Sequence, residues 1–511
     1  MLIKSGAVVL PYDSSVVQAI PYAKEGVVNG QHVVACRHGL DETLVLRNLG
    51  FPVPSPISTA YNYTGRFKPM AHQTATAEFL TLHRRCFVLN DMGTGKTASA
   101  LWAIDYLMQQ GILRRVLIVA PLSCIGVWVN EAFAVTPHRT IAAIHGSREK
   151  RRGLLDYGTE ICVINHDGVH TVLDTLKDAA FDLVLVDEAA AYRNASTRRY
   201  KSLRKLLRAD TRLWLMTGTP VPTAPTDAHA LILLVNPAKV PGSFKLFQHR
   251  VMSQISQYKW VAKPDSNEYV YNIMQPAIRF RKHDCIDLPP LVYMNRECEL
   301  SAEQQKAYTE MRRRARFEQE GVPVTAANAA VKLNKLQQIC CGVVRDEHGA
   351  PIYLNETNRL NLLEEVVEEA ETKVVVFVPY IFAMERVAAH LRKRWEVAVV
   401  NGSVPMHERD RIFAAFQNTA TPHVLVAHPQ TAAHGLTLTA ASTTVWYAPI
   451  FSAEYYTQAN NRMDRPGQKS SMAVVHIGAC PMEWQIYDAL RARNLRQSTL
   501  LALYRQEIGE G

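Results

Sequence analysis

Continuous apolar runs alternate with amphipathic segments over two long stretches of this 511-residue chain. Runs of this kind are typical of strands that are buried on both faces of a parallel sheet. The segments between them predict helices, and the segment 97–111, for example, has helical spacing and ends at Gly111. The expected strands are 86–90, 116–121, 161–165, 183–188 and 213–219 in the first stretch, and 373–379, 397–402, 423–429, 443–449 and 472–477 in the second.

The segments around these two stretches have a different character. Residues 1–50 contain two short β-like runs and one expected helix, and the proline-rich residues 50–58 are typical of a linker. Residues 240–300 have a mixed pattern, whereas 301–341 have a helical one. The sequence therefore predicts an α/β protein of two doubly wound parallel-sheet lobes. Its expected parts are an N-terminal accessory region at 1–60, a first lobe at 61–285 and a second lobe at 286–511 with a helical insert at about 301–341.

Composition narrows the class of protein without fixing a function. Hydrophobic residues make up 48% of the chain and charged residues 20%, which is typical of a soluble globular protein. We expect neither a membrane span nor a signal peptide. The net charge of +10 favours a polyanionic partner. The nine cysteines have no zinc-type spacing, so we expect buried, reduced thiols in a cytoplasmic protein.

The segment "NDMGTGKT" (90–97) carries the first candidate chemistry, because it follows an expected strand and begins an expected helix. Gly93 and Gly95 would let the backbone approach phosphate oxygens and direct N–H groups at them. Lys96 would reach the β- and γ-phosphates, and the hydroxyl of Thr97 would bind Mg²⁺. The general P-loop pattern has glycine where Asn90 stands, so the match depends on its strand–loop–helix context.

Two adjacent carboxylates at the end of the run "LVLVDE" (183–188) would complete such a site. Asp187 would bind Mg²⁺ directly or through water, and Glu188 would orient or deprotonate the attacking water. Adjacent carboxylates after a strand are often only the polar start of a loop. In the same α/β block as a P-loop, however, they predict nucleoside triphosphate hydrolysis.

From about residue 67 to about residue 477 the chain resembles the Swi/Snf-type ATPases of helicase superfamily 2, and it resembles most the compact bacterial or bacteriophage members. The similarity follows the motif order of that family. The segments that carry it are "DMGTGKT" (91–97), "VLIVAPLSCIGVWVNEA" (116–132), "HGSREKR" (145–151), "LVLVDEAAAYRN" (183–194), "MTGTPVPTAPTDAHALILLVNP" (216–237), "FRKHDCIDLPP" (280–290), "LNKLQQIC" (333–340), "GSVPMHERDRIFAAF" (402–416) and "QANNRMDRPGQ" (458–468).

The resemblance implies two RecA-like lobes, the cofactors ATP and Mg²⁺, and a set of site residues. Catalytic roles would fall to Lys96, Asp187, Glu188, Arg462 and Arg465, and metal binding to Thr97 and Asp187. The nucleotide would be bound by Gln73, which would read adenine, and by Met92, Gly93, Thr94, Gly95, Lys96, Thr97, Ala98 and Gly435. Nucleic acid would be contacted by Pro121, Ser123, Asn165, Thr217, Thr431 and His434, with added attraction from basic runs at 148–152, 198–208 and 312–316.

Arg462 and Arg465 lie three residues apart, just before a Pro-Gly turn. On a helix this spacing would place both guanidinium groups on one face. A solvated basic turn is one interpretation. The other is that the pair acts as arginine fingers, which reach the γ-phosphate from the second lobe when the cleft between the lobes closes.

The chain departs from the family pattern at two places. The fourth residue of the DEAH box is Ala190 instead of histidine, which leaves open how the nucleotide is linked to the motif that begins near Met216. The segment "TAAHGLTL" (431–438) has Ala432, Ala433 and Thr437 where the family has two glycines and an asparagine, and it retains Gly435. His434 in this segment would touch nucleic acid or nucleotide, or it would be a structural histidine.

Three functions therefore stay open. The first is a DNA-dependent ATPase that translocates on double-stranded DNA without sequence specificity, as a monomer, and remodels DNA or protein–DNA complexes. The second is a strand-unwinding or annealing DNA or RNA helicase with the same core, for which a wedge hairpin would be the distinguishing feature. The third is a nucleic-acid-binding scaffold whose ATPase has decayed. The expected location is the cytoplasm of a bacterial or phage-infected cell, or the nucleus in a eukaryote.

Overall fold

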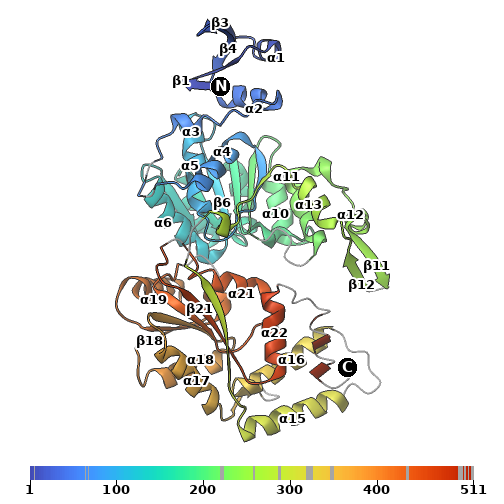
Figure 1. Cartoon of the computed structure of the whole chain (residues 1–511), viewed down its shortest axis with the longest axis vertical. Coiled ribbons are helices and arrows are strands. Elements are labelled where there is room, and N and C mark those ends of the chain that lie inside the picture. The colour runs from blue at the N-terminus through green and yellow to red at the C-terminus, as the bar shows by residue number, and fades with distance from the viewer. Residues whose placement is uncertain are drawn as a thin grey trace. The chain divides into compact units, whose positions relative to one another are not determined.

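The structure is a computed structural model. It describes residues 1–4, 6–63, 65–66, 68–218, 224–256, 259–285, 289–317, 326–345, 350–432, 437–465 and 467–492, together with 499, 502–503 and 506–507. Contacts within the chain divide it into two compact units, Met1–Ile286 and Asp287–Gly511. Each unit is built around its own parallel sheet (Figure 1). None of the described helices has the length and apolarity needed to cross a bilayer.

The first unit begins with a small antiparallel sheet that has a core of its own. Val8, Leu10, Val34 and Cys36 point from its strands into this core, where they pack with Leu46 of the helix that follows. The sequence indicated two of the four strands, because only these two alternate buried and exposed positions. The elements are β1 (Leu2–Lys4), β2 (Ala7–Pro11), α1 (Ser14–Ala19), β3 (Lys24–Val28), β4 (Gln31–Arg37) and α2 (Leu40–Asn48), with the sheet order β1-β2-β4-β3.

Seven parallel strands form the main sheet of the first unit. Each of the five strands expected from the first apolar stretch is present, although several end one to three residues earlier than the apolar run does. In sheet order the strands are β13 (Ala277–Ile278), β5 (Arg85–Val88), β10 (Arg212–Met216), β9 (Leu183–Asp187), β6 (Val116–Ala120), β8 (Ile161–Asn165) and β7 (Ile141–Ile144).

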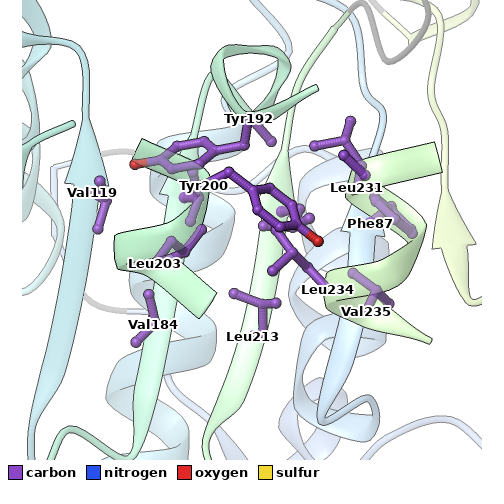
Figure 2. Packing of buried hydrophobic residues seen from close by; sticks show 14 of the residues in the cluster. Phe87, Val119, Val184, Tyr192, Tyr200, Leu203, Leu213, Leu231, Leu234 and Val235 are labelled. Atoms are coloured by element: carbon purple, nitrogen blue, oxygen red, sulfur yellow. The ribbon is translucent and has the colours of Figure 1, made fainter. Parts of the chain in front are cut away.

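Helices cover both faces of this sheet, because successive residues of each buried strand point to opposite faces. Leu213 faces one core together with Leu203 and Leu231, as Figure 2 shows. Its neighbour Trp214 faces the other core. The first face is covered by α7 (Arg148–Asp156), α8 (Gly168–Thr171), α9 (Leu173–Asp178), α10 (Arg198–Leu206) and α11 (Ala228–Val235), and the second by α3 (Ile57–Ala60), α4 (Ala71–Leu82), α5 (Lys96–Gln109) and α6 (Ile125–Val135).

A β-hairpin lies within residues 240–300, where the hydrophobic pattern was mixed. It lies between two helices whose buried residues, Phe247 and Val270, join the first core of the main sheet. Figure 1 shows the hairpin extending away from these helices. The elements are α12 (Phe244–Val251), β11 (Met252–Ser256), β12 (Lys259–Ala262) and α13 (Ser266–Ile273), followed by β13 and α14 (Lys282–Cys285).

The second unit contains six parallel strands. Its strand β17 lies between two strands that follow it in the chain, β19 and β20, as is typical of doubly wound sheets. All five strands expected from the second apolar stretch are present. The sixth is the edge strand β14, and in sheet order the six strands are β14 (Leu291–Glu297), β21 (Met472–Gly478), β20 (Ala441–Trp446), β17 (Lys373–Phe377), β19 (Val424–Ala427) and β18 (Val397–Val400).

Alternation again places helices on both faces, so the prediction of two doubly wound lobes is confirmed. Val375 and Phe377 of β17 face one core, and Val374 and Val376 face the other. The helical pattern at 301–341 corresponds to two helices. The first core includes α15 (Ala302–Phe317), α16 (Ala326–Cys340), α19 (Met406–Asn418), α21 (Ala453–Asn460) and α22 (Pro481–Arg491). The second core includes α17 (Thr357–Glu368) and α18 (Ile381–Leu391). The unit also contains α20 (Pro429–Ala432) and a hairpin of β15 (Val343–Arg345) and β16 (Pro351–Tyr353).

Candidate nucleotide site

Three strands of the first sheet bring the candidate chemistry to one edge. Strand β10 lies between β5 and β9, and its last residue, Met216, is in register with Val88 on one side and Asp187 on the other. Because the strands are parallel, the segments that follow these three residues leave the sheet at the same level. The backbone N–H of Thr217 extends this alignment by donating to the carbonyl of Val88 at 3.0 Å. The P-loop, the Asp187–Glu188 pair and Thr217 are therefore neighbours.

Gly93 and Gly95 give the P-loop the shape that its sequence predicts. Both have positive φ angles, 81° and 77°, a region that residues with a Cβ rarely occupy. A Cβ on Gly95 would also lie only 2.1 Å from Nε2 of Gln73. Helix α5 begins directly after this turn, at Lys96, so the positive end of its dipole faces the loop, where an anion would be stabilised.

The side chain of Lys96 lies over its own loop. Its ammonium donates to the carbonyl oxygens of Asn90 at 2.9 Å and Asp91 at 3.0 Å. Thr94 is buried, and its hydroxyl donates to the carbonyl of Asp91 at 2.8 Å. These bonds close the loop around Lys96 and keep the cation at the loop, where phosphate would bind.

Asn90, which replaces the first glycine of the general P-loop pattern, fixes the loop from behind. Its side chain is buried, with the amide nitrogen donating to the hydroxyl of Thr76 at 2.9 Å. Its amide oxygen accepts from the N–H of Phe280 at 3.0 Å. A glycine could make neither bond. This departure from the general pattern therefore connects the loop to α4 and to the segment after β13.

Gln73, expected to read adenine, contacts the P-loop from α4. Its amide oxygen accepts from the N–H of Met70 at 3.0 Å, and its amide nitrogen lies 3.4 Å from the carbonyl of Thr94. The neighbouring His72 is buried and makes a 2.9 Å hydrogen bond to the same carbonyl. The start of α4 therefore packs directly on the loop that would hold the triphosphate.

Asp187 and Glu188 each receive a hydrogen bond from a different element. The indole N–H of Trp128, on α6, donates to Oδ2 of Asp187 at 3.0 Å. The backbone N–H of Glu188 donates to Oδ1 of the same carboxylate at 3.0 Å. The hydroxyl of Thr217 donates to Oε1 of Glu188 at 3.2 Å.

Glu188 also has an uncommon backbone conformation. Its φ and ψ angles are 53° and 55°, in the left-handed region that non-glycine residues rarely occupy. Such a conformation costs of order 1–3 kcal/mol and persists where the surroundings impose it. Here it turns the chain sharply out of β9 and into the short helix that contains the buried Ala190.

The donors at this edge match the chemistry of a magnesium–nucleotide complex. Thr97 offers a hydroxyl and Asp187 a carboxylate, which are the hard oxygen ligands that Mg²⁺ prefers. The positive φ angles of Gly93 and Gly95 and the N-terminus of the 14-residue helix α5 suit a phosphate group. The residues present therefore fit ATP with Mg²⁺.

The arginine pair in the second unit differs from the expected arrangement on a helix. Helix α21 ends at Asn460, so neither arginine belongs to it. Arg462 is buried, with 4% of its surface exposed, and its Nε donates to the carbonyl of Gln458 at 3.1 Å. Arg465 is half-buried, and one of its terminal nitrogens donates to the hydroxyl of Thr437 at 3.0 Å. The arrangement on one helical face therefore does not apply, because the helix stops before the pair.

Thr437, one of the family departures, thus contacts a candidate arginine finger. The next residue, Leu438, donates its N–H to the carbonyl of Arg462 at 3.0 Å. The segment after β19 and the arginine segment are therefore joined at two points. Gly435 and His434, predicted to touch nucleotide and nucleic acid, lie outside the described residues.

The residues predicted to contact nucleic acid in the first unit lie at the carboxyl ends of three strands. Pro121 and Ser123 follow β6, and Asn165 is the last residue of β8; all three are half-buried. Thr217 follows β10 but is buried, with its hydroxyl directed at Glu188. Thr217 thus has a carboxylate partner in the structure, and its contact with nucleic acid stays a prediction. In the second unit Thr431 lies in α20, after β19.

Two of the basic runs each contribute an arginine to the segment around Asn165. Arg151 donates to the amide oxygen of Asn165 at 3.1 Å. Arg199 forms a bidentate pair with Asp167, at 2.5 and 2.6 Å. These hydrogen bonds to Arg199 hold the pKa of the Asp167 carboxyl below its usual range, so the pair stays charged at neutral pH. Both arginines are structural partners of the segment, which the sequence did not indicate.

One further group of potential metal ligands lies inside the second unit. Cys340, Cys480 and Glu483 are buried and bring their ligand atoms within 4.8 Å of one another. The guanidinium of Arg359 lies 2.5 Å from Glu483 and already neutralises this carboxylate. Because the pair supplies its own cation, the cluster is not a metal candidate, and it agrees with the expectation of buried cysteines in this part of the chain.

The chain has two α/β lobes, each with a parallel sheet, and the first lobe carries a P-loop and an acidic pair at the carboxyl ends of its strands. These features define a P-loop nucleotide-binding protein of helicase-like architecture. The chain belongs to the SNF2-related family: the family model described as SNF2-related domain matches residues 68–343, more than half of the chain. A second model, described as helicase conserved C-terminal domain, matches residues 358–467. The family predicted from the motifs is thereby confirmed.

Curated relatives are similar over about three quarters of the chain. An uncharacterized ATP-dependent helicase of Mycoplasma genitalium is 24% identical over 396 residues, which are 76% of this chain and 37% of that protein. The DNA annealing helicase and endonuclease ZRANB3 of Mus musculus is 24% identical over 411 residues, which are 77% of this chain and 37% of that protein. The chain thus spans little more than a third of the length of these relatives.

A solved structure also resembles this chain. It is the SWI2/SNF2 ATPase core of Sulfolobus solfataricus in complex with double-stranded DNA, at 22% sequence identity and a TM-score of 0.42. The match covers 87% of this chain and 96% of the other.

Proposed function

We propose that this protein is a DNA-dependent ATPase that couples ATP hydrolysis to translocation along double-stranded DNA and so remodels DNA or protein–DNA complexes. The observation that carries the proposal is the hydrogen bond from Thr217 to Glu188 at the edge that also holds the P-loop. It connects Glu188, a residue suited to activate water, with the segment that follows β10. Strand β10 lies between β9, which leads to Glu188, and β5, which leads to the P-loop with Lys96. Membership of the SNF2-related family supports the same function.

We assign the hydrolysis steps to residues of both units. The P-loop N–H groups and Lys96 would hold the β- and γ-phosphates, with Gln73 at the adenine. Thr97 and Asp187 would hold Mg²⁺, which when bound neutralises charge on the phosphates. Glu188, oriented by Thr217, would accept the proton of the attacking water. Arg465, and with it Arg462, would stabilise the charge on the transferring phosphoryl group.

Translocation would follow from alternating grip by the two lobes. Backbone groups and hydroxyls near Pro121, Ser123, Asn165 and Thr431 would hold DNA phosphates without reading bases. We take residues 1–60, 61–285 and 286–511 as the accessory region and the two lobes, acting as a monomer. The net charge of +10 implies DNA binding that weakens steeply as salt rises. We place the protein in the cytoplasm of a bacterial or phage-infected cell, or in the nucleus of a eukaryote.

ATP hydrolysis measured without nucleic acid, and with single-stranded DNA, duplex DNA or RNA, tests this function. We expect the largest stimulation with duplex DNA, and no stimulated hydrolysis by Lys96→Ala. A triplex-displacement assay then measures translocation apart from strand separation. Absence of hydrolysis under all conditions would favour the decayed scaffold, and stimulation by RNA alone would contradict duplex translocation.

A strand-unwinding or annealing helicase is the second candidate. One of the relatives is named a DNA annealing helicase, and this chain carries a projecting hairpin, β11–β12. Displacement and annealing of labelled strands, measured beside triplex displacement, separate this function from translocation alone.

Trp128 offers a sharper test of the metal site. Trp128→Phe removes the indole N–H that holds Asp187 and keeps an aromatic ring in the core. Because loss of an outer-shell partner typically weakens metal binding 10–100-fold, we expect the Mg²⁺ concentration for half-maximal ATPase activity to rise at least about tenfold.

The matched control for Trp128→Phe is Trp214→Phe. Trp214 is also buried, and its indole N–H donates to the carbonyl of His83 at 3.1 Å, away from the acidic pair. Both variants lose one indole hydrogen bond. An equal shift of the Mg²⁺ dependence in the two would show that the effect is general destabilisation instead of metal positioning.

A further inference from the structure

The hairpin β11–β12 has two unlike faces. Gln254 pairs with Trp260 and Met252 with Ala262, so these four residues share one face. Trp260 and Ala262 pack against the core of the first unit. On the other face Ser253 pairs with Val261, which is 42% exposed.

Ile255 belongs to the outer part of the hairpin. The register shifts between Gln254 and Ser256, so Ile255 has no partner in the opposite strand. Its side chain is 64% exposed, and the residues on either side are also exposed. The hairpin therefore presents two aliphatic side chains, those of Ile255 and Val261, to solvent.

The base of the hairpin, in contrast, is firmly held. The ring of Trp260 lies edge-on to that of His249 at 5.0 Å. Lys263 donates to the carbonyl of His249 at 2.7 Å. Arg250 pairs with Asp265 at 2.9 Å and lies 4.2 Å above the ring of Tyr269. These contacts anchor the base of both strands to α12 and α13.

The same base contacts a short helix that follows the catalytic edge of the sheet in the chain. Helices α12 and α13, which carry the hairpin, both contact the short helix Pro225–Asp227. That helix follows β10 and the Thr217 segment in the chain. Thr217 in turn bonds to Glu188. The hairpin and the phosphate site therefore belong to the same compact unit, and the hairpin would move with that unit during each ATPase cycle.

Charge around the hairpin indicates the kind of partner. The stretch 245–263 contains no aspartate or glutamate. Its cations are Lys245, Arg250, Lys259 and Lys263, of which Arg250 is already paired with Asp265, just beyond this stretch. Aliphatic side chains with cations beside them suit DNA whose base pairs are open to contact, because an apolar wedge can enter a base step while cations meet the phosphates.

We propose that the β11–β12 hairpin contacts the junction at which a DNA duplex meets two single strands, with Ile255 and Val261 packed against the terminal base pair. The inference rests on the proposed function, because translocation of the lobe would drive this wedge along the DNA. It adds a substrate feature, the fork junction, that a duplex translocase does not need.

The test uses forked DNA with the fluorescent base 2-aminopurine at the junction and, in a second substrate, deep within the duplex. Fluorescence is measured on adding the full-length protein without ATP. We expect a rise at the junction position only, because the wedge unstacks that base. The double variant Ile255→Ser with Val261→Ser should lose this rise and should separate or re-pair forked strands at least about tenfold more slowly.

The control for this double variant is Ile112→Ser. Ile112 is a 40% exposed isoleucine that precedes β6, at the amino ends of the strands, whereas the P-loop follows their carboxyl ends. This variant should keep the junction signal. Both proteins should keep duplex-stimulated ATPase activity and triplex displacement within about twofold of the unchanged protein, because neither substitution touches the phosphate site.

Failure of the inference can be told apart from failure of the proposed function. A protein that hydrolyses ATP with duplex DNA but gives no signal at the junction overturns the wedge and leaves the translocase. A junction signal that disappears in the double variant, in a protein without ATPase activity, supports the wedge and overturns the translocase. A double variant with unchanged signal and strand separation also overturns the wedge and makes the hairpin a surface for some other partner.

Discussion

Replacing Glu188 with glutamine is expected to lower DNA-stimulated ATP turnover by about 10³-fold while ATP binding is retained, because the amide cannot accept the proton of the attacking water. The substitution keeps the size of the side chain and can keep the hydrogen bond from Thr217. Folding should therefore be unaffected. Steady-state hydrolysis and binding of a fluorescent ATP analogue measure the two properties separately.

Two further variants make this prediction specific. Glu149→Gln changes an exposed glutamate of α7 and should leave turnover unchanged. Thr217→Val removes the hydroxyl that orients Glu188 but keeps the carboxylate, so we expect a smaller drop of about 10- to 150-fold, since a hydrogen bond to a charged group contributes about 1.5–3 kcal/mol. Near-normal turnover by Glu188→Gln would assign the base to another residue and return Glu188 to the role of a loop residue.

Most strands of the two parallel sheets could be predicted, because burial on both faces leaves a direct trace in the sequence, but the edge strands β7, β13 and β14 were missed. A run such as 183–187 is apolar at four consecutive positions, and the structure buries all four, two on each face. The ends of the strands were predicted less well, because the polar residues that follow an apolar run were included in the expected strand. The run 213–219, for example, becomes β10 (Arg212–Met216), and its last residues turn toward the site.

The phosphate site was equally accessible to sequence analysis, since its chemistry is local. Two glycines, a lysine and a threonine at fixed spacing lie between a strand and a helix, and this order alone predicts the loop. The contacts of Trp128 and Asn90 left no such trace. Trp128 meets Asp187 across 59 positions of the chain, and Asn90 meets Phe280 across 190. Only the folded sheet brings these residues together.

The hairpin and the arginine segment show two other limits of sequence analysis. Strand β11 is mostly exposed, so it has no apolar run and its period could not be recognised. For the arginines, the three-residue spacing was considered on a helix, but α21 ends at Asn460, before the pair. The hydrogen bonds of Arg462 and Arg465 to the segment around Thr437 depend on tertiary contacts, which no short motif records.

Arg465→Ala is expected to lower ATP turnover on the order of 10³-fold and to leave ATP and DNA binding intact. Arg465 is the better candidate finger of the two, because Arg462 is 4% exposed and its backbone carbonyl and side chain are bonded within the second unit. Arg465 is half-buried, and the hydroxyl of Thr437 accepts from its guanidinium. Thr437 therefore fixes the position of the guanidinium, and Arg465 is the more exposed of the two arginines.

The control for Arg465→Ala is Arg394→Ala, which removes an arginine from surface ion pairs with Glu364 and Glu368. It should retain normal turnover, because exposed pairs of this kind contribute little. Arg462→Ala, in contrast, should lower the thermal stability of the protein, since it empties a buried position. Turnover is compared at saturating ATP and DNA, so that a loss reflects the chemical step and not binding. If Arg465→Ala turns over ATP normally while Arg462→Ala remains folded and inactive, the finger is Arg462, and Arg465 belongs to a solvated turn.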